Sequence, residues 1–237
     1  MDRDFNDRYV YSAADATPLE RAGFIRRTYL HLAGAILAFI GVEAFFFVSG
    51  VADVVIGMLQ FVGRFSWLLV LGAFMVVSWV ANKWAVSTVS SGTQYLGLAL
   101  YVVAEALIFI PLLYVVASFA DGAETIVKAG IVSLGLFAGP TAVVFITRTD
   151  FSFLRSVLAV GGLVALGVIV ASIIFGFTLG TVFAFIMVAF AASAILYNTS
   201  GVMHRYHPSQ HVAASLALFA SIALLFWYVL QIFGSDD

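Results

Sequence analysis

The segment TQYLGLALYVVAEALIFIPLLYVVASF, residues 93–119, is apolar along almost its whole length and carries a single charged residue, Glu105. A helix needs about 20 apolar residues to cross the ~30 Å hydrocarbon layer of a bilayer. The segment therefore predicts a membrane-spanning helix, and its one acid lies near the centre of that span.

The composition extends this prediction to most of the chain. Of its 237 residues, 63% are hydrophobic and 10% are charged, with a mean hydropathy of +1.08. A soluble domain carries about 25% charged residues, so most of this chain must face lipid. We expect a bilayer as its surroundings and no nucleic-acid partner. The chain has no cysteine, which excludes disulfides and thiolate metal sites.

Seven segments are long and apolar enough to span a bilayer, and they predict an all-α, polytopic seven-helix bundle. The expected spans are about 29–49, 65–86, 93–119, 126–147, 153–177, 181–202 and 212–233. Residues 1–28 are expected to form a tail, 29–233 the transmembrane domain, and 234–237 a short C-terminal tail. The apolar run Val51–Gly63 is too short to cross, and predicts an interfacial helix.

The basic residues give the expected orientation. With the N-terminus in the cytoplasm, nine of them lie inside and two outside. The nine are Arg3, Arg8, Arg21, Arg26, Arg27, Lys83, Arg148, Arg155 and Arg205, and the two are Arg64 and Lys128. The positive-inside rule predicts this asymmetry, which places the C-terminus outside.

Two acids fall within the predicted spans, where ionisable groups are costly and therefore informative. Glu105 follows Tyr101 by four residues, so both lie on one helical face and can hydrogen-bond. Glu43 lies nearer the end of the first span. Either acid is a candidate proton-sensing group in an ion pathway. The alternative is a structural hydrogen bond, or for Glu43 a side chain that reaches toward the interface.

The segment HRYHPSQH, residues 204–211, brings three histidines into the last predicted loop: His204, His207 and His211. Histidine titrates near neutral pH, so the loop is a candidate pH sensor. The spacing of His207 and His211 would suit a metal on a helix, but Pro208 between them favours a solvated loop. We expect neither a bound metal nor a cofactor.

Enzyme signatures are missing from the sequence. It contains no HExxH pair, no glycine-rich phosphate loop and no GxSxG elbow. Ser200 or Ser221 near a loop histidine would permit an intramembrane hydrolase, but nothing marks either as an activated nucleophile. We expect a protein that is not an enzyme.

Several stretches resemble the Bax inhibitor-1 family, and within it the bacterial YccA-like branch. They are RRTYLHLAGAILAF (26–39), EALIFIPLL (105–113), TAVVFITRTDFSFL (141–154), SAILYNTSGVMH (193–204) and SLALFASIALLFWYVLQIFG (215–234). The resemblance implies six helices around a central last helix, in a bacterial inner membrane. It also implies a pH-dependent calcium leak, or modulation of the membrane AAA protease FtsH.

The resemblance also implies how the calcium-leaking relatives sense protons. In them, an acid in the sixth span forms a pair with an acid in the seventh. The first of these positions corresponds to Asn198, within Tyr197-Asn198-Thr199, and the second to Ser221. An Asn–Ser pair can hydrogen-bond but does not titrate near neutral pH. Two hypotheses follow: a weak cation leak that relies on Glu105, and a non-conducting partner of a membrane protease that acts through the N-terminal tail.

Overall fold

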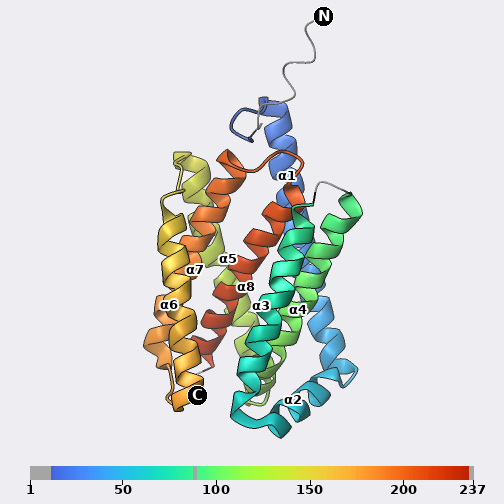
Figure 1. Cartoon of the computed structure of the whole chain (residues 1–237), viewed down its shortest axis with the longest axis vertical. Helices are drawn as coiled ribbons and strands as arrows, with labels where there is room; N and C mark the ends of the chain where they lie inside the picture. The colour runs from blue at the N-terminus through green and yellow to red at the C-terminus, as the bar shows by residue number, and fades with distance from the viewer. Residues whose placement is uncertain (1–11, 88–89, 235–237) are drawn as a thin grey trace, which may run out of the picture.

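A computed structural model describes residues 12–87 and 90–234, apart from the side chain of Arg64, and these residues form helices and no strands (Figure 1). The helices are α1 (Pro18–Val48), α2 (Val51–Val62), the 3-10 turn η2 (Gly63–Phe65), α3 (Ser66–Ala85), α4 (Ser91–Ala117), α5 (Gly122–Thr147), α6 (Leu154–Phe175), α7 (Gly180–His204) and α8 (His211–Phe233).

Seven of these helices are long and apolar enough to cross a membrane. The predicted fold class, an all-α multi-pass bundle, is confirmed. The short apolar run after the first span forms helix α2, which crosses one end of the bundle beneath α3 and α4 (Figure 1).

The start of the first helix differs from the prediction. We expected a tail as far as residue 28, but α1 begins at Pro18. Thr17 and Glu20 form a capping box: Thr17 Oγ1 accepts from the Glu20 N–H at 3.4 Å, and Glu20 Oε2 accepts from the Thr17 N–H at 3.0 Å. This cap satisfies N–H groups that a helix start leaves unpaired. The predicted tail residues 1–11 and 235–237 lie outside the described residues.

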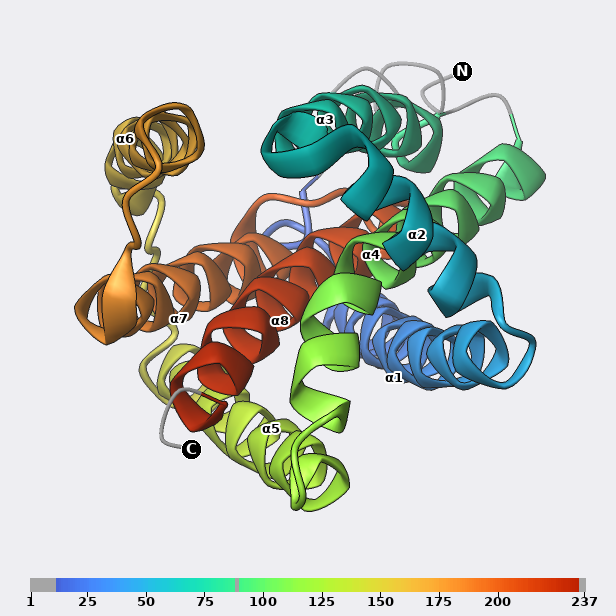
Figure 2. The ribbon, with the colours of Figure 1, turned by 90° about the horizontal axis from the view of Figure 1, so that it is seen from below.

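Helix α8 occupies the centre of the bundle, as predicted. It packs against α1, α3, α4, α5 and α7, and Figure 2 shows it enclosed by its neighbours. Buried residues such as Leu216, Leu225 and Leu230 face different sides of the helix. Lipid supplies no hydrophobic drive for association, so this close packing is what holds the helices together.

Helix α6 is peripheral. It packs chiefly on α7 and touches α3 and η2, and Ala165 is its one buried residue. Figure 2 shows α6 standing apart from α8, on the far side of α7 from α5. Because α6 does not reach α8 or α4, the region between α3 and the α6–α7 pair is less tightly filled than the opposite side.

Candidate functional site

A cavity of about 980 Å³ lies in this region, walled by α3, α4, α6, α7, α8 and the α6–α7 connection. Its size is at the upper end of the range typical of small-molecule sites, roughly 300–1,000 Å³. Most of the lining is apolar, and a few polar side chains interrupt it at defined places. These polar side chains are the candidate site.

Asn198 on α7 and Ser221 on α8 line the cavity and touch each other. Asn198 Nδ2 donates to Ser221 Oγ at 2.9 Å and to the Ala217 carbonyl at 3.2 Å. Ser221 Oγ donates to the same carbonyl at 2.9 Å. The hydrogen bond expected between these two side chains is therefore present, and it joins the last two helices without a charge.

Glu105 lines the same cavity, from α4. It is 7% exposed and follows the buried Tyr101 by one helical turn, so the two side chains share one face of α4, as the four-residue spacing predicted. The Tyr101 ring packs against Phe74 and Phe219, which fixes the hydroxyl in place. Among the described residues that line the cavity, Glu105 is the only acid, and none is a lysine, arginine or histidine.

Glu43 is not part of this cavity. It is buried, and neither of its carboxyl oxygens has a hydrogen-bond partner among the described residues. The expectation that its side chain reaches the interface is wrong. The reason is helical geometry: Glu43 follows Phe39 by one turn on the buried face of α1, where Phe39 packs against Phe109.

The three loop histidines do not form one group. His204 Nδ1 bonds to the Ser200 carbonyl at 3.0 Å, and His207 Nδ1 lies 2.8 Å from Ser209 Oγ. His211 instead packs against His31 of α1, with ring centroids 4.9 Å apart. Within residues 12–87 and 90–234, no group of three potential metal ligands is found. The three histidines therefore do not form a single pH-sensing cluster.

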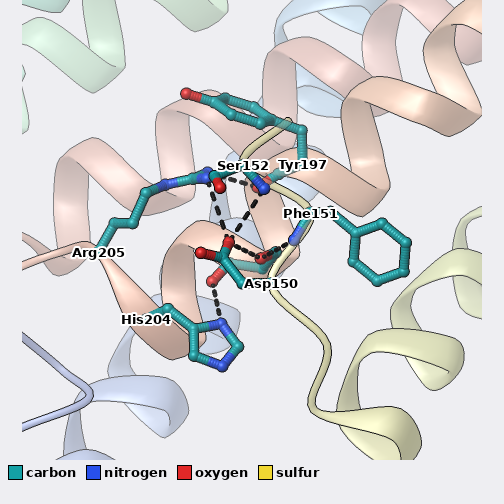
Figure 3. A network of polar contacts seen from close by, with 7 residues as sticks. Asp150, Phe151, Ser152, Tyr197, His204 and Arg205 are labelled. Atoms are coloured by element: carbon teal, nitrogen blue, oxygen red, sulfur yellow. Dashed lines mark hydrogen bonds and ion pairs between the residues drawn. The ribbon is translucent and has the colours of Figure 1, made fainter. Parts of the chain in front are cut away.

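A polar network at the α7–α8 end of the bundle was missed by the sequence reasoning, although the TRTDFSFL stretch had been noted (Figure 3). Ser200 Oγ on α7 accepts from the Phe151 N–H at 2.9 Å and donates to Asp150 Oδ1 at 3.1 Å. The Ser152 N–H donates to the same Asp150 oxygen at 3.0 Å. Ser200 thereby fastens the α5–α6 connection to α7.

Arg205 completes this network from the end of α7. Its Nη2 donates to the Tyr197 carbonyl at 2.7 Å, its guanidinium lies 4.0 Å from the Tyr197 ring centre, and its Nη1 lies 3.8 Å from Asp150 Oδ1. Tyr197 directly precedes Asn198, so the network also steadies the backbone that presents Asn198 to the cavity.

The charge of Asp150 supports the same arrangement. Partial burial alone would raise the pKa of Asp150, but hydrogen bonds from Ser200 and Ser152 and the nearby Arg205 charge hold it below its ordinary value. The resulting stabilisation is present above the unfolded-state pKa, about 3.9, and is lost as pH falls through the lower folded-state pKa. Since 49% of the Asp150 side chain is exposed, this stabilisation is small.

We predict that Ser200→Ala lowers the stability of the bundle by about 1–3 kcal/mol, because the Phe151 N–H loses its acceptor and Asp150 loses a donor. Thermal unfolding in detergent, followed by tryptophan fluorescence, measures the change. Ser193→Ala is the matched control, since Ser193 lies on the same helix, is surface-facing and bonds only to the Ala189 carbonyl. Equal unfolding temperatures for the two variants would contradict a stabilising network.

Comparisons with known proteins identify the family of the chain. A family model described as "Inhibitor of apoptosis-promoting Bax1" matches residues 21–237. A Pseudomonas aeruginosa protein, "Uncharacterized protein PA2604", is 29% identical over 235 residues, which cover 96% of each chain. "Bax inhibitor 1" of Schizosaccharomyces pombe is 34% identical over 119 residues, 47% of this chain and 43% of the yeast protein.

The family model spans the whole helical bundle from within α1 to the C-terminus, including the cavity and the polar network. The resemblance noted in the sequence is thus confirmed at the level of the family. This multi-pass membrane protein belongs to the Bax inhibitor-1 family.

Proposed function

We propose that the protein acts in ion homeostasis as a weak, pH-modulated cation leak, with Glu105 as the group that attracts the cation. One observation carries this proposal: the cavity that contains the Asn198–Ser221 pair has a buried carboxyl group as its only acid among the described lining residues. Acids inside membrane proteins usually mark ion or proton pathways, because burying them is costly.

The neutral Asn198–Ser221 pair supports the choice of Glu105. Neither side chain changes its charge near neutral pH, so the pair can link α7 to α8 but cannot respond to protons. Glu105 can exchange a proton, and the cavity connects it with the two helices that the pair joins.

The donor set also predicts a weak site. Calcium in proteins takes six to eight oxygen ligands, with affinity set by the number of charged ones. Here a single carboxylate lines the cavity among the described residues, together with neutral oxygens such as those of Asn198 and Ser221. Such a set of oxygen ligands would bind Ca²⁺ or another cation weakly, which is consistent with a slow leak.

We predict that Glu105→Gln lowers cation flux at least about tenfold, the equivalent of roughly 1.4 kcal/mol, and removes its pH dependence. Only the ionised carboxyl group attracts a cation, so wild-type flux should rise with pH. Proteoliposomes loaded with a calcium-sensitive dye measure flux between pH 6 and pH 8. Glu43→Gln is the control, because Glu43 is buried outside the cavity. Equal, pH-independent flux in wild type and Glu105→Gln would remove Glu105 from the mechanism.

A second candidate function is that of a non-conducting modulator of a membrane-bound AAA protease. The uncharged Asn198–Ser221 contact favours this function. A hydrogen bond that only holds α7 to α8 does not need a side chain that changes its charge with pH. The described N-terminal segment is fastened to the bundle: the Ala13 N–H donates to the Tyr206 carbonyl at 2.8 Å, and Arg21 Nε donates to the Ala13 carbonyl at 2.7 Å. A partner could therefore engage residues 1–11 without disturbing these contacts.

If this second function holds, deletion of residues 1–11 should abolish co-purification of the protease with the tagged protein from solubilised membranes. The truncated and intact proteins should unfold at the same temperature, because the deletion ends before the first residue of every contact described above. Unchanged recovery of the protease would exclude the tail as its binding element, and absence of the protease from both samples would reject the second function.

A further inference from the structure

The cavity wall is unusually rich in aromatic side chains contributed by several helices. They include Trp67, Phe74, Tyr101, Trp227 and Tyr228. Aromatic rings offer a large apolar surface, and their faces attract cations, especially where water is excluded.

The rings support one another, so the wall is preformed. Trp67 of α3 meets Trp227 of α8 edge to face at 6.3 Å between ring centroids, and Phe109 of α4 meets Trp227 in the same manner at 5.0 Å. Farther along, Phe74 packs on Tyr101 at 5.8 Å. Rings held by their neighbours lose little freedom when a ligand binds, which favours affinity.

Among the described residues that line this aromatic cavity, only Glu105 can carry a carboxylate charge. No described lining residue is a lysine, arginine or histidine, and the other titratable side chains that line the cavity are the tyrosines Tyr101 and Tyr228. None of the described lining residues from α7 and α8, Asn198 and Ser221 among them, carries a formal charge at neutral pH. An ionised Glu105 would therefore have no counter-charge among the described residues of the cavity lining, which makes a bound cation the natural partner.

The side of the cavity toward α6 is the least tightly packed. The wall that separates the cavity from the lipid includes α6, which packs chiefly on α7 and touches α3 and η2. The α6–α7 connection lines the cavity and contains Gly180 with φ +66°, a left-handed conformation at the start of α7. Hydrophobic molecules concentrate in the bilayer, so access past α6 would be direct.

From the volume, the aromatic wall and the lone carboxyl group together, we propose that the cavity is a binding site for a hydrophobic organic cation. Its apolar rings or chains would fill the space between α3 and α7, and its positive charge would lie next to the carboxyl group of Glu105. The site is the cavity of the proposed leak, but the inference does not depend on conduction: a protein that passes no ions can still bind such a cation.

Equilibrium binding tests the inference with tetraphenylphosphonium as the probe and the intact protein in lipid nanodiscs, with empty nanodiscs as the blank. We expect saturable binding with one probe per protein. Glu105→Gln should weaken it at least about tenfold, equivalent to about 1.4 kcal/mol. Glu43→Gln should bind as the wild type does, because that carboxyl group is buried outside the cavity. Lowering the pH should weaken binding to the wild type and leave Glu105→Gln unaffected, since protons compete with the probe for one carboxyl group.

Uncharged triphenylphosphine oxide is the matched control ligand. It should bind far more weakly than tetraphenylphosphonium, and its affinity should be the same in wild type and Glu105→Gln. Equal affinity for the two ligands would overturn the inference and mark the cavity as a general apolar pocket filled by lipid chains. Unaltered tetraphenylphosphonium binding in Glu105→Gln would overturn it as well. Neither result affects the flux measurement, which records inorganic cations and so judges the leak separately.

Discussion

The burial of α8 among five other long helices is the constraint on which the rest of the structure depends. Polar side chains on a helix at this position are costly unless they find hydrogen-bond partners inside the bundle. Ser215 does so by donating to the Thr28 carbonyl of α1 at 2.7 Å, and Ser221 by accepting from Asn198 of α7. The polar contacts of α8 therefore hold α1 and α7 in place against it. On the side toward α6, which does not contact α8, the cavity remains.

Much of the fold follows from lengths and compositions that can be read along the chain. Seven apolar runs predict seven long helices because the hydrocarbon thickness sets their minimum length, and the structure agrees. The start of α1 was misplaced because apolar character begins near Tyr29, whereas the helix begins at the Thr17 cap. That cap is visible in the sequence as Thr-Pro-Leu-Glu, so attention to capping would have corrected the boundary.

The site was predictable where the contact is local or carried by the family resemblance. Tyr101 and Glu105 share a helical face through their spacing, and the family resemblance led us to expect the Asn198–Ser221 contact. The cavity itself, the burial of Glu43 and the pairing of His211 with His31 depend on how helices pack. The pattern of residues within a single helix does not predict how that helix packs against the others. The structural role of Ser200 was not predictable, because its partners Asp150 and Phe151 lie in the connection between α5 and α6.

The central claim is that Glu105 lines the cavity, whereas Glu43, which is equally buried, lies outside it. The chain has no cysteine, so Glu105→Cys and Glu43→Cys each create a single reactive thiol. The rate of modification by the cationic reagent aminoethyl methanethiosulfonate, measured in nanodiscs by mass spectrometry, reports access to each position. The account predicts that Glu105→Cys reacts at least about tenfold faster than Glu43→Cys, because only position 105 lines the cavity that a reagent can enter. Equal rates, or faster reaction of Glu43→Cys, would contradict it.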